Sequence, residues 1–112
     1  VRDVLLVEDD SLVAGATRDL LVQWGLRVRH VETSADAIAQ AGFGQVAICD
    51  VRLPHAASGL ELAIALREAG KKVLLISGET QTSLRETAQR HHLSLLIKPV
   101  SSAQLFTALR QL

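Results

Sequence analysis

Five short runs of strand length, four of them apolar, alternate with helical patterns along this chain, and this alternation constrains the fold more than any other feature. The runs occupy residues 4–7, 27–31, 46–49, 73–76 and 95–97. Each run is followed by a segment whose apolar spacing or capping residues indicate a helix. Strands that alternate with helices in this way form a parallel sheet with right-handed crossovers.

The polarity of these runs predicts their order in the sheet. Continuous apolar strands are typical of central positions, where both faces are covered, and the first, third and fourth runs are of this kind. The second run is polar and the fifth is short, which suits the two edges. The sequence therefore predicts an α/β fold, a (βα)5 flavodoxin-like doubly wound parallel sheet with strand order 2-1-3-4-5.

Capping residues and glycines predict where the helices begin and end. The first helix, over residues 11–24, should turn an apolar stripe inward, and residues 79–92 should form a weakly amphipathic fourth helix. The expected N-terminal caps are Asp10 or Asp9, Thr33, Ser58 and Ser101, and the expected terminating glycines are Gly25, Gly42 and Gly70. The expected inward side chains are Leu12, Ala16, Leu20 and Trp24, then Ile38 and Ala41, then Leu84 and Ala88, then Leu105, Leu109 and Leu112.

The composition limits the location and the partners of the chain. Its 112 residues suit one domain over residues 1–112. Because 12 basic and 12 acidic side chains cancel, no net field attracts nucleic acid or a membrane, and no apolar run approaches the ~20 residues of a membrane span. The single cysteine, Cys49, is expected in the core and suits a reducing compartment, so we expect a cytoplasmic protein. The start at Val1 indicates a piece excised from a longer protein.

Polar side chains stand where four of the predicted strands end. They are Glu8 with Asp9, then Asp50, then Ser77 with Gly78, and finally Lys98. Because parallel strands end at one rim, and ligands bind outside their carboxyl ends, we expect these residues to converge. Three crowded carboxylates are tolerable around a hard cation, and Mg²⁺ prefers oxygen ligands. The nearby hydroxyl and ammonium groups indicate an anionic, oxygen-rich ligand such as phosphate.

Each of these residues has a simpler interpretation when it is taken alone. Asp10 or Asp9 caps the first helix, and an Asp at a strand end often caps the next turn. A residue such as Ser77 is more often part of a turn, and Lys98 alone reads as a solvated charge. The coincidence of acid, acid, hydroxyl and amine at four strand ends is much more specific than any one of them.

With these residues in place, the whole chain resembles the receiver domain of two-component response regulators. The resemblance rests on Leu5-Leu6-Val7-Glu8-Asp9-Asp10, on Asp50 followed by Leu53-Pro54 and Gly59, on Ser77-Gly78 and on Lys98-Pro99. Within this family, the chain most resembles the receivers of hybrid sensor histidine kinases. This narrower resemblance rests on Val51-Arg52-Leu53-Pro54, Ser58-Gly59-Leu60-Glu61 and Leu95-Leu96-Ile97-Lys98-Pro99-Val100.

This resemblance implies a role for each matching residue. Asp50 would be the phospho-acceptor, and Mg²⁺ would be held by Glu8, Asp9, Asp50 and the carbonyl of Arg52. Arg52, Ser77, Gly78 and Lys98 would bind the phosphoryl group, and the Lys98-Pro99 peptide bond would be cis. The implied activity is self-phosphorylation and autodephosphorylation. The implied partner is a histidine kinase or a histidine phosphotransfer protein, which docks near the first helix; a weak homodimer is left open, and this domain is expected to bind neither nucleic acid nor membrane.

Two departures from the family pattern concern the conformational switch and the loop after Asp50. Receivers usually carry an aromatic residue three positions before the lysine, and this chain has Leu95 there. We therefore expect a switch through Ser77 and the following helix, without a rotating aromatic ring. The loop from Asp50 to Gly59 is one residue longer than the commonest form, and Arg52 occupies a position from which side chains reach attacking water.

Other functions remain as alternatives at this point. The chain could be a stand-alone single-domain regulator instead of part of a hybrid kinase. Mg²⁺-dependent phosphatases with an Asp nucleophile commonly have a second Asp two residues later, where this chain has Arg52. A flavin or nucleotide carrier needs a phosphate-cradling loop after the first strand, and Glu8-Asp9-Asp10 would repel phosphate there without a metal. An interaction domain that is never phosphorylated would not need the acidic, hydroxyl and amine side chains together at the strand ends.

Overall fold

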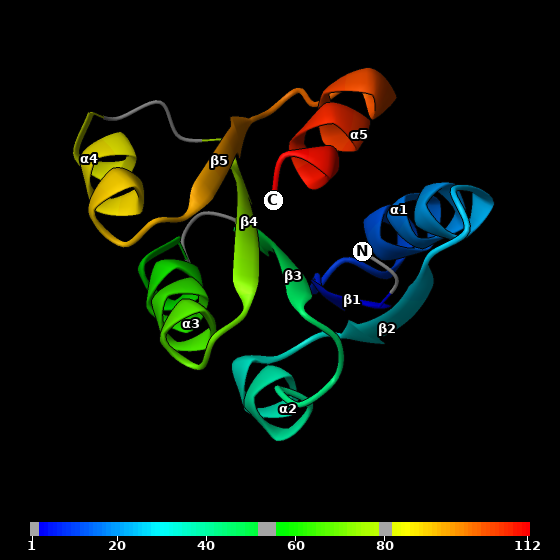
Figure 1. Cartoon of the computed structure of the whole chain (residues 1–112), viewed down its shortest axis with the longest axis horizontal. Coiled ribbons are helices and arrows are strands. Elements are labelled where there is room, and N and C mark those ends of the chain that lie inside the picture. Colours follow the sequence, from blue (N-terminus) through cyan, green and yellow to red (C-terminus); the bar gives the residue numbers. More distant parts are fainter. Residues whose placement is uncertain (1–2, 52–55, 79–81) are drawn as a thin grey trace.

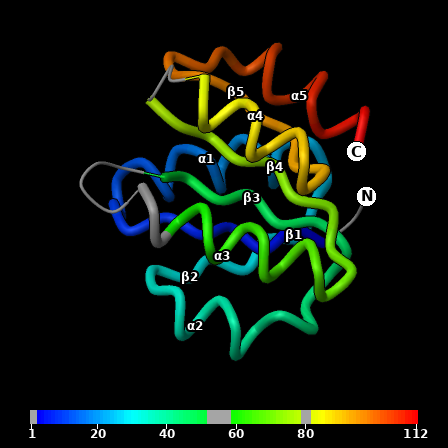
Figure 2. Tube along the Cα trace, turned by 90° about the vertical axis from the view of Figure 1, so that its left-hand side faces the viewer, coloured from blue at the N-terminus to red at the C-terminus, as the bar shows by residue number. Residues whose placement is uncertain are grey.

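The computed structural model describes residues 3–51, 56–78 and 82–112 as a parallel sheet between two layers of helices. The strands are β1 (Asp3–Val7), β2 (Arg27–Val31), β3 (Val46–Val51), β4 (Lys72–Ser77) and β5 (Ser94–Ile97), and the helices are α1 (Ser11–Gln23), α2 (Ser34–Ala39), α3 (Ala56–Glu68), α4 (Thr82–Arg90) and α5 (Ser102–Arg110). All paired strands are parallel, and their order is β2-β1-β3-β4-β5 (Figure 2). The predicted fold class and strand order are confirmed.

The sheet carries a separate hydrophobic core on each face, because successive side chains of a strand point to opposite sides. Helices α1 and α5 cover one face, and α2, α3 and α4 cover the other (Figure 1). Leu6 and Ile48 lie in the first core, whereas Leu5 and Leu75 lie in the second. The edge strand β2 alternates exposed and partly buried residues, as its polar sequence predicts.

Several helix ends were predicted correctly from capping residues. Asp10 caps α1, since its side chain accepts hydrogen bonds from the backbone N–H groups of Leu12 and Val13. Gly25 follows α1 with a φ of 86°, a conformation that glycine adopts without steric cost. Ser101 forms a reciprocal capping box with Gln104 at the start of α5.

The buried face of α1 differs from the predicted stripe. Ala14 and Leu21 are its buried residues, whereas Leu12 is 85% exposed and Ala16 is exposed too. The predicted stripe was spaced strictly by four residues, and such a series drifts around a helix with 3.6 residues per turn. Helix α1 therefore presents part of its apolar surface to solvent.

Predictions for α2 and α3 were wrong in three details. Ile38 is 54% exposed, and the neighbouring Ala37 is buried in its place. The glycine with positive φ after α2 is Gly44, at 69°, and not Gly42. Because α3 begins at Ala56, Ser58 lies inside the helix and does not cap it.

Candidate phosphoryl-acceptor site

Asp50 stands inside β3, one residue before the strand ends. The sequence placed the end of this strand at Cys49, but Asp50 pairs with Ile76 and Val51 pairs with Ser77 in the β3–β4 ladder. Backbone pairing on this central strand therefore holds the Asp50 main chain in place. The side chain of Asp50 is only 8% exposed, so its carboxylate is largely removed from water.

Lys98 meets Asp50 across the rim of the sheet. Its Nζ lies 2.6 Å from Oδ1 of Asp50, and about a third of the lysine side chain remains exposed. The backbone N–H of Lys98 donates to the carbonyl of Ser77 at 2.8 Å, which ties the end of β5 to the end of β4. The Lys98-Pro99 peptide bond is cis, as the resemblance implied. The predicted meeting of the β5 ammonium with the β3 carboxylate is thus present.

Glu8 brings a second carboxyl group to the same place. It is buried, with 1% of its surface exposed. Burial is the largest cause that raises the pKa of Glu8 to about 8, and hydrogen bonds with the side chains of Asp50 and Asp9 contribute to the same rise. The backbone N–H of Asp10 donates to Oε2 of Glu8 at 3.1 Å, which acts in the opposite direction on the pKa. Three acidic side chains therefore interact at the ends of β1 and β3.

These oxygen ligands fit a Mg²⁺ ion. Within residues 3–51, 56–78 and 82–112, no group of three Asp, Glu, His or Cys side chains forms a ready-made metal cage. Mg²⁺ does not require one, because it usually keeps several waters and binds one or two carboxylates. Because burial raises the pKa of Glu8, its negative charge is unfavourable at this place. A cation near Glu8 and Asp50 would relieve that unfavourable charge.

The remaining predicted site residues differ in their position relative to Asp50. Ser77 is buried at the end of β4, one register step beyond the Asp50–Ile76 pair, and Gly78 follows it at the surface. Leu95 is partly buried and packs against the core under α3 and α4. Arg52 lies outside the described residues, as does Pro54.

A groove of about 650 Å³ leads from the protein surface to Asp50 between α1 and α5. It is lined by Val13, Ala16, Thr17 and Leu20 of α1, by Asp50 and Ile76, and by Lys98, Pro99, Val100, Ser101, Ser102 and Leu105. The sequence placed a docking partner near the first helix, but it did not predict that residues of α1 and α5 line a groove to Asp50. The short side chains of Ala16, Thr17, Ser101 and Ser102 among the lining residues were the available signal.

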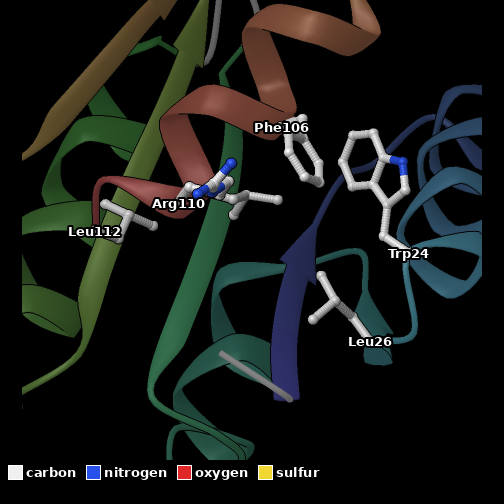
Figure 3. Close-up of a pocket in the computed structure, with 6 residues that line it drawn as sticks. Trp24, Leu26, Phe106, Arg110 and Leu112 are labelled. Carbon is white, nitrogen blue, oxygen red and sulfur yellow. The ribbon is translucent and has the colours of Figure 1, made fainter.

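A second hollow, of about 350 Å³, lies between the same two helices at the other end of the sheet. Figure 3 shows Phe106 turned toward the indole ring of Trp24 in this hollow. The two rings pack edge to face with centroids 5.0 Å apart, and the Arg110 guanidinium lies 5.7 Å from the Phe106 centroid. The Trp24–Phe106 pair thus links α1 to α5 away from Asp50.

Comparisons with known proteins agree with this geometry. The sequence model of the family of response regulator receiver domains matches residues 4–110 of this chain. The receiver domain of a CheY-like protein from Methanospirillum hungatei JF-1 is similar in structure, with a TM-score of 0.87 and 22% identity, over 99% of this chain and 92% of that one. Chemotaxis protein CheY4 of Vibrio cholerae is similar with a TM-score of 0.85 and 23% identity, over 99% of this chain and 98% of that one. A CheY-like receiver domain from Methylobacillus flagellatus is similar with a TM-score of 0.81 and 29% identity, over 99% of this chain and 98% of that one. No relative is found among curated protein sequences.

Among the described residues, no helix is long and apolar enough to cross a bilayer.

Proposed function

Because the chain belongs to the family of response regulator receiver domains, we propose that it accepts a phosphoryl group on Asp50 from a phosphohistidine in a Mg²⁺-dependent reaction. The observation that carries the proposal is the contact between the nearly buried Asp50 carboxylate and the Lys98 ammonium at the end of an open groove. This arrangement combines a nucleophile, a fixed positive charge and access for a donor.

The transfer forms one bond and breaks one. A carboxylate oxygen of Asp50 attacks phosphorus, and the bond from phosphorus to the imidazole nitrogen of the donor breaks. Lys98 stabilises the charge that develops on the phosphoryl oxygens, since it already stands 2.6 Å from the attacking carboxylate. Glu8, Asp9, Asp50 and the Arg52 carbonyl would hold Mg²⁺, which when bound neutralises charge on the carboxylates and the phosphoryl group.

The product would be held by groups on neighbouring strand ends. In the proposal, the Ser77 hydroxyl and the Gly78 backbone bind the phosphoryl group from β4, and Lys98 binds it from β5. Charge-assisted hydrogen bonds of this kind are stronger than neutral ones. The Arg52 side chain is assigned to the approach of attacking water, which would set the rate of autodephosphorylation.

Labelling with a small phosphodonor tests the proposal. The protein is incubated with acetyl phosphate and Mg²⁺, and the modified residue is mapped by mass spectrometry. Wild type is expected to carry the label on Asp50, and Asp50→Asn none. Asp36→Asn, a change on the exposed surface of α2, is the matched control and should label like wild type. Equal labelling of Asp50→Asn and wild type would refute the assignment.

The donor is expected to be a helical phosphotransfer protein or the phosphorylated domain of a histidine kinase that docks against α1. Leu12 is 85% exposed, and the small residues Gly15 and Ala16 lie near it on α1. Of these residues, Ala16 also lines the groove that leads to Asp50, so an apolar helix packed on this part of α1 would bring its histidine to the rim. Chemical-shift changes confined to the opposite end of the strands would rule out this docking mode.

The conformational response is proposed to run through Ser77 and α4. Leu95 replaces the usual aromatic residue and has no polar tip that could follow the Ser77 hydroxyl. Leu84 and Ala88 are the buried residues of α4, so a few contacts hold this helix to the sheet. Hydrogen exchange with and without beryllofluoride should change in α4 and little around Leu95; the reverse pattern would assign the switch to β5.

The context of the domain is proposed from its motifs. We favour the receiver of a cytoplasmic hybrid sensor histidine kinase, with a stand-alone regulator as the alternative. An Asp-nucleophile phosphatase is less favoured because Arg52 stands where such enzymes commonly have a second Asp. A phosphatase would release phosphate from added substrates in many turnovers, whereas a receiver accumulates phospho-Asp50.

A further inference from the structure

Backbone contacts to the edge strand β2 hold the acidic turn formed by residues 8–10. The N–H of Glu8 donates to the carbonyl of Val31 at 3.0 Å, which continues the β1–β2 ladder beyond the last residue of β1. The carbonyl of Glu8 lies 2.7 Å from Nε2 of His30. The contact with Val31 is ordinary ladder pairing, but the contact with His30 comes from a side chain that the sequence analysis did not single out.

The chemistry of the contact between His30 and the Glu8 carbonyl identifies which ring nitrogen of His30 carries the hydrogen. A backbone carbonyl oxygen only accepts hydrogen bonds, so Nε2 of His30 must carry the hydrogen. His30 is half-buried on β2, opposite Leu6 in the β1–β2 register. Its ring therefore reaches along the neighbouring strand to the peptide group that follows Glu8.

The peptide between Glu8 and Asp9 is a rigid plane, so fixing its carbonyl fixes the whole group. Glu8 leaves one end of this plane, and its carboxylate is additionally bonded to the N–H of Asp10 at 3.1 Å. Asp9 leaves the other end and is exposed, so the direction of its side chain depends on the orientation of that plane. Asp10 is held by its role as the α1 cap.

We propose that His30 is a positioning residue for the metal site. Its Nε2–H sets the Glu8–Asp9 peptide plane and thereby the directions in which both carboxylates face Mg²⁺. The inference rests on the proposed function, because it assigns these two residues to Mg²⁺. Partners one step removed from a metal are typically worth ~10-fold or more in metal affinity.

Two substitutions separate positioning from packing. His30→Leu keeps a side chain of moderate size but removes the donor, and His30→Gln keeps an N–H donor at similar reach. Mg²⁺ affinity of the unphosphorylated protein is measured by calorimetry, and stability by urea unfolding without Mg²⁺. We expect His30→Leu to weaken Mg²⁺ binding about 10-fold and His30→Gln to stay close to wild type. Arg29→Ala, on the same strand but bonded to Gln40 and stacked on Phe43, should leave Mg²⁺ affinity unchanged.

Wild-type affinity in His30→Leu, or equal weakening in the Leu and Gln variants at unchanged stability, would overturn the proposal. If His30→Leu does not fold, the wild-type protein decides the question through the ¹⁵N shifts of the His30 ring. A ring protonated only on Nδ1 would contradict the contact. Failure of the proposed function is distinct, because it would appear as wild-type protein that binds Mg²⁺ but carries no label on Asp50.

Discussion

Two lysines at opposite ends of the same sheet show how surroundings decide the role of one residue type. At the carboxyl end of the strands, the Lys98 ammonium faces the Asp50 carboxylate in an open groove. At the amino end, Lys71 is buried and donates to the carbonyls of Phe43 and Gly44 at 2.5 and 2.7 Å. Burial lowers the pKa of Lys71. Lys98 meets a carboxylate in an open groove, whereas Lys71 meets neutral backbone carbonyls in the interior.

This difference separates a rim of interacting charged groups from a rim of satisfied hydrogen bonds. The carboxyl rim contains interacting carboxyl groups, and burial together with contacts to Asp50 and Asp9 raises the pKa of Glu8 there. The amino rim contains satisfied backbone groups and the edge-to-face contact of Trp24 with Phe106. A ligand or modification can stabilise the charged groups of the carboxyl rim, whereas the amino rim needs no ligand because its groups already have partners. The five predictions below test that division.

The largest contrast is expected between Lys98→Met and Lys71→Met. Loss of the ammonium near the phosphoryl group should slow labelling of Asp50 about 100-fold, the effect of removing one preorganised donor. Lys71→Met should label at the wild-type rate but lose about 1 kcal/mol in unfolding free energy, because two carbonyls lose their donor. Phosphorylation kinetics and urea unfolding measure the two effects. A Lys71 variant that labels as slowly as the Lys98 variant would break the comparison.

A glycine near the carboxyl rim should affect both stability and chemistry. A Cβ at Gly59 of α3 would lie 2.7 Å from Cγ2 of Val51, next to Asp50. Gly59→Ala should therefore destabilise by about 1–3 kcal/mol through overpacking, and slow labelling by shifting the end of β3. Gly15→Ala in α1 is the matched control, since its Cβ would meet nothing within 4 Å, and should stabilise by roughly 0.5–1 kcal/mol.

The corresponding glycine at the amino rim should affect stability alone. Gly44 has a φ of 69°, and a Cβ there would lie 2.8 Å from Cβ of Asp3. Gly44→Ala should lower the unfolding free energy, whereas Gly42→Ala, with open space around it, should not. The labelling rate of folded Gly44→Ala should equal that of wild type. A slower rate would show that the two rims are coupled.

The two rims should also differ in their dependence on pH. The pKa of Glu8 is raised from 4.5 to about 8, so the Mg²⁺-free folded protein binds a proton that the unfolded chain releases. Its contribution to stability is complete below about pH 4.5 and is lost as pH rises toward 8. The lowered pKa of Lys71 acts in the other direction and only in the alkaline range, where stability should rise with pH. Urea unfolding between pH 5 and 8 should show a fall that Glu8→Gln abolishes.

The smallest effect is expected in the layer between the rims. Cys49 is 2% exposed, and burial raises the pKa of its thiol to about 12. The folded protein should therefore resist thiol reagents, with or without Mg²⁺, and react only as it unfolds. Labelling with a maleimide in increasing urea measures this. Rapid labelling without urea would show that β3 opens next to Asp50, and that the carboxyl rim is less rigid than the structure indicates.

The sequence by itself determined the strand order, the meeting of Asp50 with Lys98 and the caps at Asp10 and Ser101. These features depend on local periodicity, on local hydrogen bonds and on the rule that parallel strands end at one rim. Only the tertiary structure decided that Leu12 and Ile38 are exposed. The rotation of a helix about its axis depends on the whole surface under it, and the spacing of apolar residues leaves that rotation ambiguous. The contact of His30 with Glu8 and the raised pKa of Glu8 were likewise beyond the sequence. Both arise between groups that are distant in the chain and are brought together, out of water, only when the strands pair.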